Sequence, residues 1–388
     1  MIQRQKKIAI FMSSLQVGAR ERLMVKVGKE LNNQGSLVRF VFIGGNQEIK
    51  GLVGPCLSKT NLIAWANQVP ILKKINKLKL FIGVWPLKNF LKKEKPDVLL
   101  AVSIPPSIAI LTAKILANSK TKIIVRQSNV IKLANVPEFS NVRRRPRDFI
   151  IPLLYKKAEG FIAVSEGVKS NLKLLLGRDK HIEVIYNKVL NKEWFLTPSH
   201  KPSHQWFNDE NIIVFLAVGR LVEKKDYATM IKAFQIASRQ YAKIRLLILG
   251  EGPQRNKLQK LIDKAQIKDK VELLGHIQNP HPYYYYSFGY LLSSVSEGMP
   301  SSVIEALGSA CQIISTDCPS GPSEILSGGE YGKIVAIKDY ETMAKSISES
   351  LNNTIPKSKL LERAFDFTSE NGVKEYVSMI SKFCQTQK

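Results

Sequence analysis

Short apolar runs alternate with helical repeats of apolar positions along the first half of the chain. Continuous apolar runs are typical of buried strands, whereas apolar positions three and four residues apart indicate helices. The predicted strands are 7–12, 37–43, 98–102, 122–126, 160–164 and 183–186, and the predicted helices are 19–34, 107–118, 148–159 and 166–176. Strands that alternate with helices in this way predict a parallel sheet.

This alternation stops between residues 187 and 211, which makes that interval the best candidate for a linker, and then begins again. Beyond it the predicted strands are 212–218, 244–249, 271–274, 288–292 and 312–315, and the predicted helices are 226–240, 253–265, 302–307 and 340–351. Because one hydrophobic core rarely grows beyond about 250–300 residues, we predict an α/β protein with two doubly wound, Rossmann-like domains. The expected domains are residues 1–195 and 196–370, and a helix within 371–388 is expected to pack back on the first domain.

The formal net charge of +26 is concentrated in the first half of the chain. Residues 1–200 contain 35 Lys and Arg against 12 Asp and Glu, whereas the remainder contains 23 against 20. Such a basic half suits an anionic partner, which could be nucleic acid, an acidic membrane surface or a phosphorylated substrate. Lysine-rich codon usage is the simpler explanation, but it would load both halves equally.

Cysteine usage and hydropathy narrow the class of protein further. The four cysteines are too few and too scattered for a disulfide framework or a zinc cluster. We find no metal-ligand spacing and expect no cofactor. No stretch of eighteen residues is apolar throughout, so no membrane-spanning helix is expected. The apolar run after Lys7 is too short for a signal sequence, which favours a cytoplasmic protein.

Residues 71–95 combine an apolar helical face with eight lysines, opposed only by Glu94. Such a helix can lie on an anionic membrane, where each lysine contributes on the order of 1 kcal/mol. The residues expected to meet the membrane are Lys73, Lys74, Lys77, Trp85, Lys92 and Lys93. A surface helix that packs on the core and presents a solvated lysine face is the alternative interpretation.

Two glutamates, Glu297 and Glu305, lie eight positions apart across a Gly/Pro turn. A strand is predicted before them, and a helix is expected from Ser302 to Leu307 with Ser301 or Ser302 as its N-cap, so one glutamate lies in the loop and the other on the helix. In open α/β sheets such loops bind ligands, and free N–H groups at a helix start attract anions. A nucleotide sugar would supply hydroxyls for the two carboxylates and phosphates for the helix start. An ordinary solvated turn followed by an amphipathic helix is the alternative interpretation.

Three further segments follow predicted strands. Arg220 and Lys225 come after the first strand of the second half and would reach a diphosphate, with roughly 1.5–3 kcal/mol per charge-assisted bond. The turn that begins at Gly250 leads into a helix with proline at its first position. The third segment ends at Ile277, where the backbone could pair with a base edge. Each segment alone is a weak signal, because glycine turns are common after strands.

In this order the segments resemble the C-terminal domain of GT-B glycosyltransferases, specifically the retaining family four. The match runs from about Val218 to Gly332 and includes Gly-Arg-Leu followed by a lysine, Leu-Gly-Glu-Gly-Pro, Leu-Leu-Gly, the glutamate pair and the segment Ile314–Leu326. The chain looks like members that build bacterial surface polysaccharides and lipid-linked oligosaccharides. The resemblance implies a GT-B fold, in which two Rossmann-like domains face each other across a cleft, and transfer without a divalent metal.

The resemblance also assigns roles to individual residues. Glu305 would hold the ribose hydroxyls and Glu297 would contact the donor sugar. Arg220 and Lys225 would neutralise the departing diphosphate, where negative charge develops. The remaining residues assigned to the donor are Gly298, Met299, Ile277, Gly250 and Gly18.

The first half matches the family less well. Val17 stands where the family usually has the first of two glycines. No histidine follows the strand that ends at Arg126, where the family often has one, so Gln127, Asn129 or a residue elsewhere would make that polar contact. The candidate acceptor and phosphate residues are Arg126, Asn129, Arg143, Arg144 and Arg145.

The sequence therefore predicts a retaining glycosyltransferase on the inner face of the plasma membrane. It would move a hexose or N-acetylhexosamine from a UDP-sugar to a polyprenyl-diphosphate-linked saccharide during synthesis of a bacterial surface polysaccharide or glycan. A soluble acceptor is the nearest alternative. A nucleic-acid-binding protein is disfavoured, because the basic segments lack interleaved aromatic residues and any recognition motif.

Overall fold

The computed structural model describes residues 4–12, 19–42, 58–61, 76–131 and 147–385. The chain folds as two compact units. The first unit contains Met1–Tyr186 together with Glu370–Lys388, and the second contains Asn187–Ser369. The division therefore follows Tyr186, before the expected boundary at residue 195.

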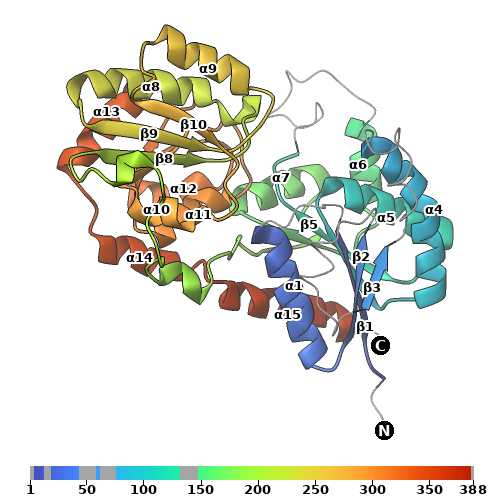
Figure 1. Ribbon diagram of the computed structural model, residues 1–388. Coiled ribbons are helices and arrows are strands. Elements are labelled where there is room, and N and C mark those ends of the chain that lie inside the picture. Colours follow the sequence, from blue (N-terminus) through green and yellow to red (C-terminus); the bar gives the residue numbers. More distant parts are fainter. Residues whose placement is uncertain (1–3, 13–18, 43–57, 62–75, 132–146, 386–388) are drawn as a thin grey trace. The chain divides into compact units, whose positions relative to one another are not determined.

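The first unit is built on a parallel sheet of seven strands (Figure 1). Their order is β3-β2-β1-β4-β5-β6-β7. The strands are β1 (Lys7–Met12), β2 (Leu37–Phe42), β3 (Ser58–Asn61), β4 (Val98–Val102), β5 (Lys122–Gln127), β6 (Gly160–Ala163) and β7 (His181–Val184). β4 is buried along its whole length because each of its residues is apolar and helices cover both faces of the sheet.

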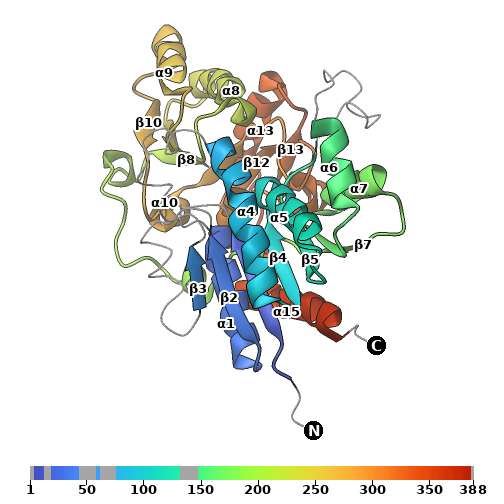
Figure 2. The same cartoon turned by 90° about the vertical axis from the view of Figure 1, so that its right-hand side faces the viewer.

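The helices of the first unit are α1 (Ala19–Asn33), α4 (Asn76–Glu94), α5 (Ile104–Ala117), α6 (Arg147–Tyr155), α7 (Glu166–Leu176) and α15 (Ser369–Gln385). Figure 2 shows α4, α5 and α6 along one side of the sheet. Leu23 and Leu31 of α1 share a buried cluster with Met379 of α15 and side chains of β1 and β2. None of the helices in the described ranges is long and apolar enough to cross a membrane.

Helix α15 is also joined to the first unit by polar contacts. Nε of Arg126 donates a hydrogen bond to the Tyr376 hydroxyl at 2.6 Å, and both residues are buried. Nζ of Lys382 pairs with the Glu183 carboxylate at 2.8 Å. The last helix of the chain therefore belongs to the first unit, although the residues before it belong to the second.

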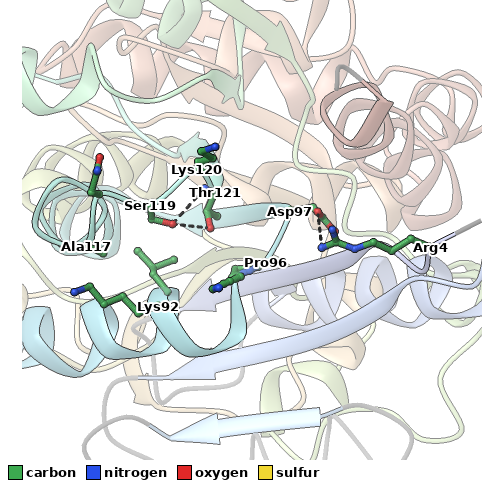
Figure 3. Close-up of a pocket in the computed structure, with 11 residues that line it drawn as sticks. Arg4, Lys92, Pro96, Asp97, Ala117, Ser119, Lys120 and Thr121 are labelled. Carbon is green, nitrogen blue, oxygen red and sulfur yellow. Dashed lines mark hydrogen bonds and ion pairs between the residues drawn. The ribbon is translucent and has the colours of Figure 1, made fainter. Parts of the chain in front are cut away.

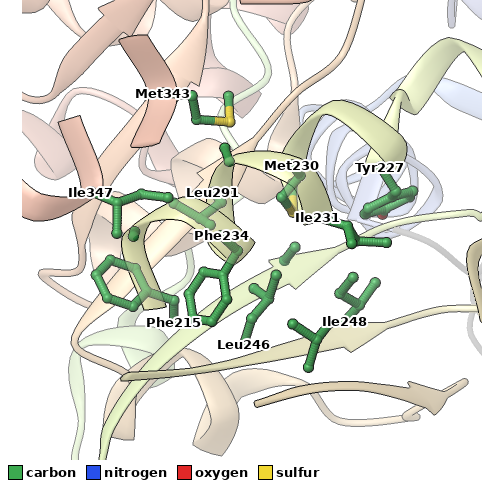
Figure 4. Packing of buried hydrophobic residues seen from close by; sticks show 14 of the residues in the cluster. Phe215, Tyr227, Met230, Ile231, Phe234, Leu246, Ile248, Leu291, Met343 and Ile347 are labelled. Carbon is green, nitrogen blue, oxygen red and sulfur yellow. The ribbon is translucent and has the colours of Figure 1, made fainter. Parts of the chain in front are cut away.

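The second unit contains a parallel sheet of six strands in the order β10-β9-β8-β11-β12-β13. The strands are β8 (Ile213–Val218), β9 (Ile244–Leu249), β10 (Val271–Gly275), β11 (Gly289–Leu292), β12 (Gln312–Thr316) and β13 (Lys333–Val335). The helices are α8 (Tyr227–Gln240), α9 (Arg255–Lys264), α10 (His281–Tyr286), α11 (Ser301–Gly308), α12 (Pro322–Ile325), α13 (Tyr340–Asn352) and α14 (Lys357–Phe365). Figure 4 shows Phe215 of β8, Phe234 of α8 and Ile347 of α13 in its core.

The predicted linker packs on the second unit. Leu190 is fully buried and forms a β-bridge with Thr368. The indole Nε1 of Trp194 donates a hydrogen bond to the Glu305 carbonyl at 2.9 Å. Trp206 is buried as well. These contacts explain why the division falls at the start of this segment rather than within it.

Candidate active site

The strand order of the second unit reverses between β8 and β11. Strand β8 pairs with β9 on one side and β11 on the other, so the loops after β8 and β11 leave the sheet side by side. In open α/β sheets the crevice at such a reversal is where ligands bind. Arg220 and Lys225 follow β8, and Glu297 follows β11. The topology thus places the three residues predicted to be catalytic in the two loops that leave the sheet at its reversal.

Glu297 is the buried acid of this site, with 7% of its surface exposed. Its Oε1 accepts a hydrogen bond from the Ser294 hydroxyl at 2.8 Å and lies 2.7 Å from Nζ of Lys225. Its Oε2 lies 3.6 Å from Nζ of Lys224. One carboxylate therefore meets two ammonium groups at the edge of the sheet.

The charge of Glu297 is set by a competition between burial and these cations. Burial alone would raise the pKa of the Glu297 carboxyl. Lys225 and Lys224 outweigh it, with help from the hydrogen bonds of Lys225 and Ser294, and lower the pKa below its ordinary value. The carboxylate is thus ionised at neutral pH. A buried and charged acid beside a strand reversal is a candidate for function.

The two cations of the β8 loop are held differently. Lys225 is largely buried, and its Cε lies 3.3 Å from the place where a Cβ on Gly219 would stand. Arg220 is exposed, and within the described residues its guanidinium has no ion pair or hydrogen bond. Arg220 is therefore open to an anion from solvent, whereas Lys225 is fixed by Glu297.

Glycines allow the loops after β8, β9 and β10 to touch. Gly250 has a φ of +143°, and a Cβ there would stand 2.0 Å from the carbonyl oxygen of Gly219. A Cβ on Gly252 would stand 2.4 Å from the carbonyl oxygen of Leu221. The Gly250 N–H donates to the Gly275 carbonyl at 2.7 Å. These turns hold the loops of the site against one another.

Gly250→Ala is expected to destabilise the protein by about 2–4 kcal/mol, since a left-handed backbone and an overlap with backbone both oppose a side chain there. Urea unfolding would measure the loss. Gly328→Ala is the matched control, because Gly328 also has a positive φ, of +68°, but open space around it. Equal losses in the two variants would show that the loop contact contributes nothing.

Glu305 lies on α11 and is held by two aromatic residues. The Tyr284 hydroxyl donates to its Oε2 at 3.1 Å, and Trp194 binds its carbonyl as described above. Helix α11 begins at Ser301 after Pro300, and no side chain caps its first turn. The predicted serine cap is therefore wrong, and no side-chain oxygen competes for the first N–H groups of the helix.

The other residues assigned to the donor lie around this edge. Gly298 and Met299 follow Glu297, and a Cβ on Gly321 would stand 2.5 Å from the Gly298 carbonyl oxygen. The side-chain amide of Asn187 donates to the Met299 carbonyl at 2.6 Å. Ile277 is half-buried just after β10. Gly18 lies outside the described residues.

Of the residues predicted for the acceptor, the structure describes Arg126 and Asn129. Arg126 is 1% exposed and donates to the side chains of Tyr376 and Ser128. Asn129 is exposed, and its carbonyl accepts a hydrogen bond from Gln127. Arg143, Arg144 and Arg145 lie outside the described residues.

Of the residues predicted to meet a membrane, Trp85, Lys92 and Lys93 are exposed on α4. The side chain of Trp85 is 63% exposed, and Nζ of Lys88 lies 4.0 Å from the centre of its ring. Leu87 of the same helix is fully buried, so α4 also packs on the sheet. Lys73, Lys74 and the side chain of Lys77 lie outside the described residues.

Sequence reasoning missed the partners that fix the two glutamates. Ser294 and Lys224 bind Glu297, and Tyr284 binds Glu305. Ser294 lies only three residues before Glu297, so its proximity was visible in the sequence. Tyr284 sits in a run of four tyrosines on a helix that was not predicted. In the described ranges, no group of three His, Cys, Asp or Glu could hold a metal ion.

Two known protein families match successive parts of this chain. The family model described as Glycosyltransferase Family 4 matches residues 21–189, and the model described as Glycosyl transferases group 1 matches residues 197–366. The two matches follow one another along the chain and correspond closely to its two sheets. Together with the doubly wound units, they define a two-domain α/β transferase.

Two proteins with similar sequences are named as glycosyltransferases. An uncharacterized glycosyltransferase of Methanocaldococcus jannaschii is 30% identical over 63% of each chain. The N-acetylgalactosamine-N,N'-diacetylbacillosaminyl-diphospho-undecaprenol 4-alpha-N-acetylgalactosaminyltransferase of Campylobacter jejuni is 28% identical over 67% of this chain and 70% of its own. The match to the first of these relatives thus spans less than two thirds of its length.

Solved structures share the fold. A glycosyltransferase from Rickettsia africae superposes with a TM-score of 0.76 at 16% identity, covering 99% of this chain and all of its own. Anabaena HepE, solved in complex with UDP, superposes with a TM-score of 0.73 at 14% identity, covering 97% of this chain and all of its own. The chain belongs to the GT-B glycosyltransferases that combine a family 4 domain with a group 1 domain.

Proposed function

We propose that this glycosyltransferase moves a hexose or N-acetylhexosamine from a UDP-sugar, with retention of configuration, to a polyprenyl-diphosphate-linked saccharide. The family domains and the names of its relatives support a role in bacterial polysaccharide or glycan synthesis. The observation that carries the proposal is the buried, ionised Glu297 between Lys225 and Lys224 at the strand reversal. Such an acid suits a sugar with several hydroxyls.

The donor would lie along the carboxyl edge of the second sheet. Glu305 would accept hydrogen bonds from the ribose hydroxyls, and the backbone near Ile277 would pair with the base. The uncapped start of α11 and the exposed Arg220 would receive the diphosphate. Support for a uridine nucleotide comes from HepE and a pneumococcal O-GlcNAc transferase, both of which were solved with UDP.

Transfer would break the bond between the anomeric carbon and the diphosphate oxygen. The acceptor hydroxyl would attack the anomeric carbon from the face that the diphosphate vacates, and its proton would pass to a phosphate oxygen. No protein base is then needed. Arg220 and Lys225 would stabilise the negative charge that develops on the leaving diphosphate. In other enzymes a metal ion stabilises this charge.

The proposed acceptor and membrane follow from charge and from a named relative. The Campylobacter enzyme acts, by its name, on a diphospho-undecaprenol saccharide. The excess of positive charge in residues 1–200 would hold the enzyme on an anionic inner leaflet. On α4, the exposed Trp85, Lys92 and Lys93 would contribute to this contact.

The experiment for this proposal offers the purified full chain a panel of nucleotide sugars and both lipid-linked and soluble saccharides. Mass spectrometry should find one sugar added from a UDP donor to a polyprenyl-diphosphate saccharide. NMR of the product should show the anomeric configuration of the donor. Addition only to soluble saccharides would favour the alternative acceptor, and an inverted anomer would contradict the retaining mechanism.

A further inference from the structure

We propose that the outer face of α5 and α6 is the surface that docks the first unit on an anionic lipid bilayer. This α5–α6 face consists of Ile115, Leu116, Phe149, Ile150 and Leu153. The inference rests on the membrane association proposed above and deepens it, because it names a surface beside α4 that the lysine pattern of the sequence does not reveal.

The α5–α6 face is apolar and exposed. Helices α5 and α6 pack against each other, and Figure 2 shows them side by side. The exposed fractions are 51% for Ile115, 53% for Leu116, 65% for Phe149, 48% for Ile150 and 66% for Leu153. Of the twelve large apolar residues exposed in the described part of the chain, these five gather on two neighbouring helices. Single exposed apolar residues are ordinary, but a cluster marks an interaction surface.

The sequence of α6 explains why its outer side is apolar. Asp148, Ile151 and Tyr155 are buried and lie on the inner side of α6. A helix that only covers a sheet carries polar residues on its other side. Phe149, Ile150 and Leu153 occupy that other side of α6 instead. This face therefore suits an apolar partner.

Lysines lie at one end of the α5–α6 face, where the two helices end. A hollow of about 520 Å³ lies at the ends of the two helices, and Ile115 lines it. The lysines that line the same hollow are Lys114, Lys156, Lys157 and Lys180. Its acidic residue, Glu159, is already paired with Lys114. Apolar side chains beside an excess of lysine suit acidic lipids, because the apolar side chains can insert among the acyl chains and the lysines can bind the phosphates.

The basic rim continues toward α4. A second hollow, of about 380 Å³, shares Asn118 and Ser119 with the first. Figure 3 shows Arg4, Lys92 and Lys120 around it. The rim thus runs from the end of α6 past α5 to the end of α4, the helix on which Trp85 is exposed. Phosphates of several lipid headgroups could be bound along such a rim.

The apolar side chains favour a bilayer over nucleic acid. Single-stranded nucleic acid is bound by cations together with aromatic platforms for the bases. Phe149 is the one aromatic side chain of the face, and the other four side chains are aliphatic and provide no such platform. Insertion among acyl chains would remove these aliphatic side chains from water.

Flotation of the full chain with vesicles tests this surface. The vesicles contain phosphatidylcholine alone or phosphatidylcholine mixed with phosphatidylglycerol. The wild type should float with the acidic vesicles at low salt. We expect the double variants Phe149→Ser/Leu153→Ser and Lys156→Ala/Lys157→Ala each to partition roughly tenfold less. Two controls in the second unit, Leu196→Ser and Lys257→Ala/Lys260→Ala, remove equally exposed residues and should float like the wild type.

The outcomes separate this surface from the proposed function. Full flotation of Phe149→Ser/Leu153→Ser would overturn the α5–α6 face, while membrane association itself would stand. A wild type that does not float but still gains thermal stability from UDP would overturn membrane association and this surface together, and leave the donor proposal intact. A third outcome would assign the rim to nucleic acid: the wild type binds RNA but does not float, and Lys156→Ala/Lys157→Ala no longer binds RNA. In each variant, a gain in thermal stability from UDP equal to that of the wild type would show that the variant is folded.

Discussion

Lys225→Met is expected to lower the rate of sugar transfer about 100- to 1,000-fold, because it removes a fixed positive charge from the site where the leaving diphosphate becomes negative. Steady-state kinetics with the nucleotide sugar that the panel experiment finds to be the donor would measure this loss. Lys224→Met is the matched control. Nζ of Lys224 lies 3.6 Å from Glu297 rather than 2.7 Å, and its side chain is 49% exposed, so we expect a loss of less than about tenfold.

The same variant should also change the pH dependence of transfer. In the wild type the pKa of Glu297 is lowered, so the carboxylate stays ionised well into the acidic range. Without Lys225, burial would outweigh the remaining Lys224 and raise that pKa. The acidic limb of the kcat/KM profile should therefore move to higher pH in Lys225→Met. An unmoved limb would show that Glu297 does not act as a carboxylate in transfer.

The lowered pKa has a consequence for stability as well. In the wild type Glu297 contributes stability above its ordinary, unfolded pKa, and this contribution is lost as the pH falls through the lower folded pKa. In Lys225→Met the sign reverses, because a raised folded pKa destabilises the ionised form. The difference in free energy of unfolding between Lys225→Met and the wild type should therefore become smaller as the pH falls from neutral.

Glu305→Ala is expected to weaken UDP binding about 100-fold, because two charge-assisted hydrogen bonds to the ribose would be lost. Titration calorimetry with UDP and with 2',3'-dideoxy-UDP would measure this effect. If Glu305 binds the ribose hydroxyls, the dideoxy analogue should bind the wild type and the variant within about threefold of each other.

Tyr284→Phe is the matched control for Glu305→Ala. It removes the hydrogen bond to Oε2 of Glu305 and leaves the carboxylate in place. We expect at most a tenfold loss of UDP affinity from the less firmly held side chain. Equal losses for UDP and its dideoxy analogue in Glu305→Ala would contradict the ribose assignment.

Much of the fold could be predicted because central strands are apolar throughout. Strands 7–12, 98–102 and 244–249 form with the predicted bounds. Strand β3 was missed because its four residues, Ser-Lys-Thr-Asn, are polar, as an edge strand allows. The helix predicted over 148–159 ends at Tyr155, where two lysines turn the chain toward β6.

The candidate site was predictable in its residues but not in its contacts. Glu297 and Lys225 could be singled out from glycine turns and from a family pattern. Their ion pair depends on β8 lying beside β11, although β9 and β10 come between them in the sequence. The burial of Arg126 against Tyr376 likewise depends on the return of the last helix to the first unit, so its polar partner was not visible in the sequence.

Hydrogen–deuterium exchange with and without UDP tests most directly whether the nucleotide sugar binds at the strand reversal of the second unit. UDP should slow exchange in the loop after β8 that holds Arg220 and Lys225, and in the segment from Glu297 to Glu305. Strand β13 and helix α13, away from the reversal, should exchange at the same rate in both states. UDP protection confined to the first unit, or the absence of protection in both of these loops at saturating UDP, would contradict this assignment.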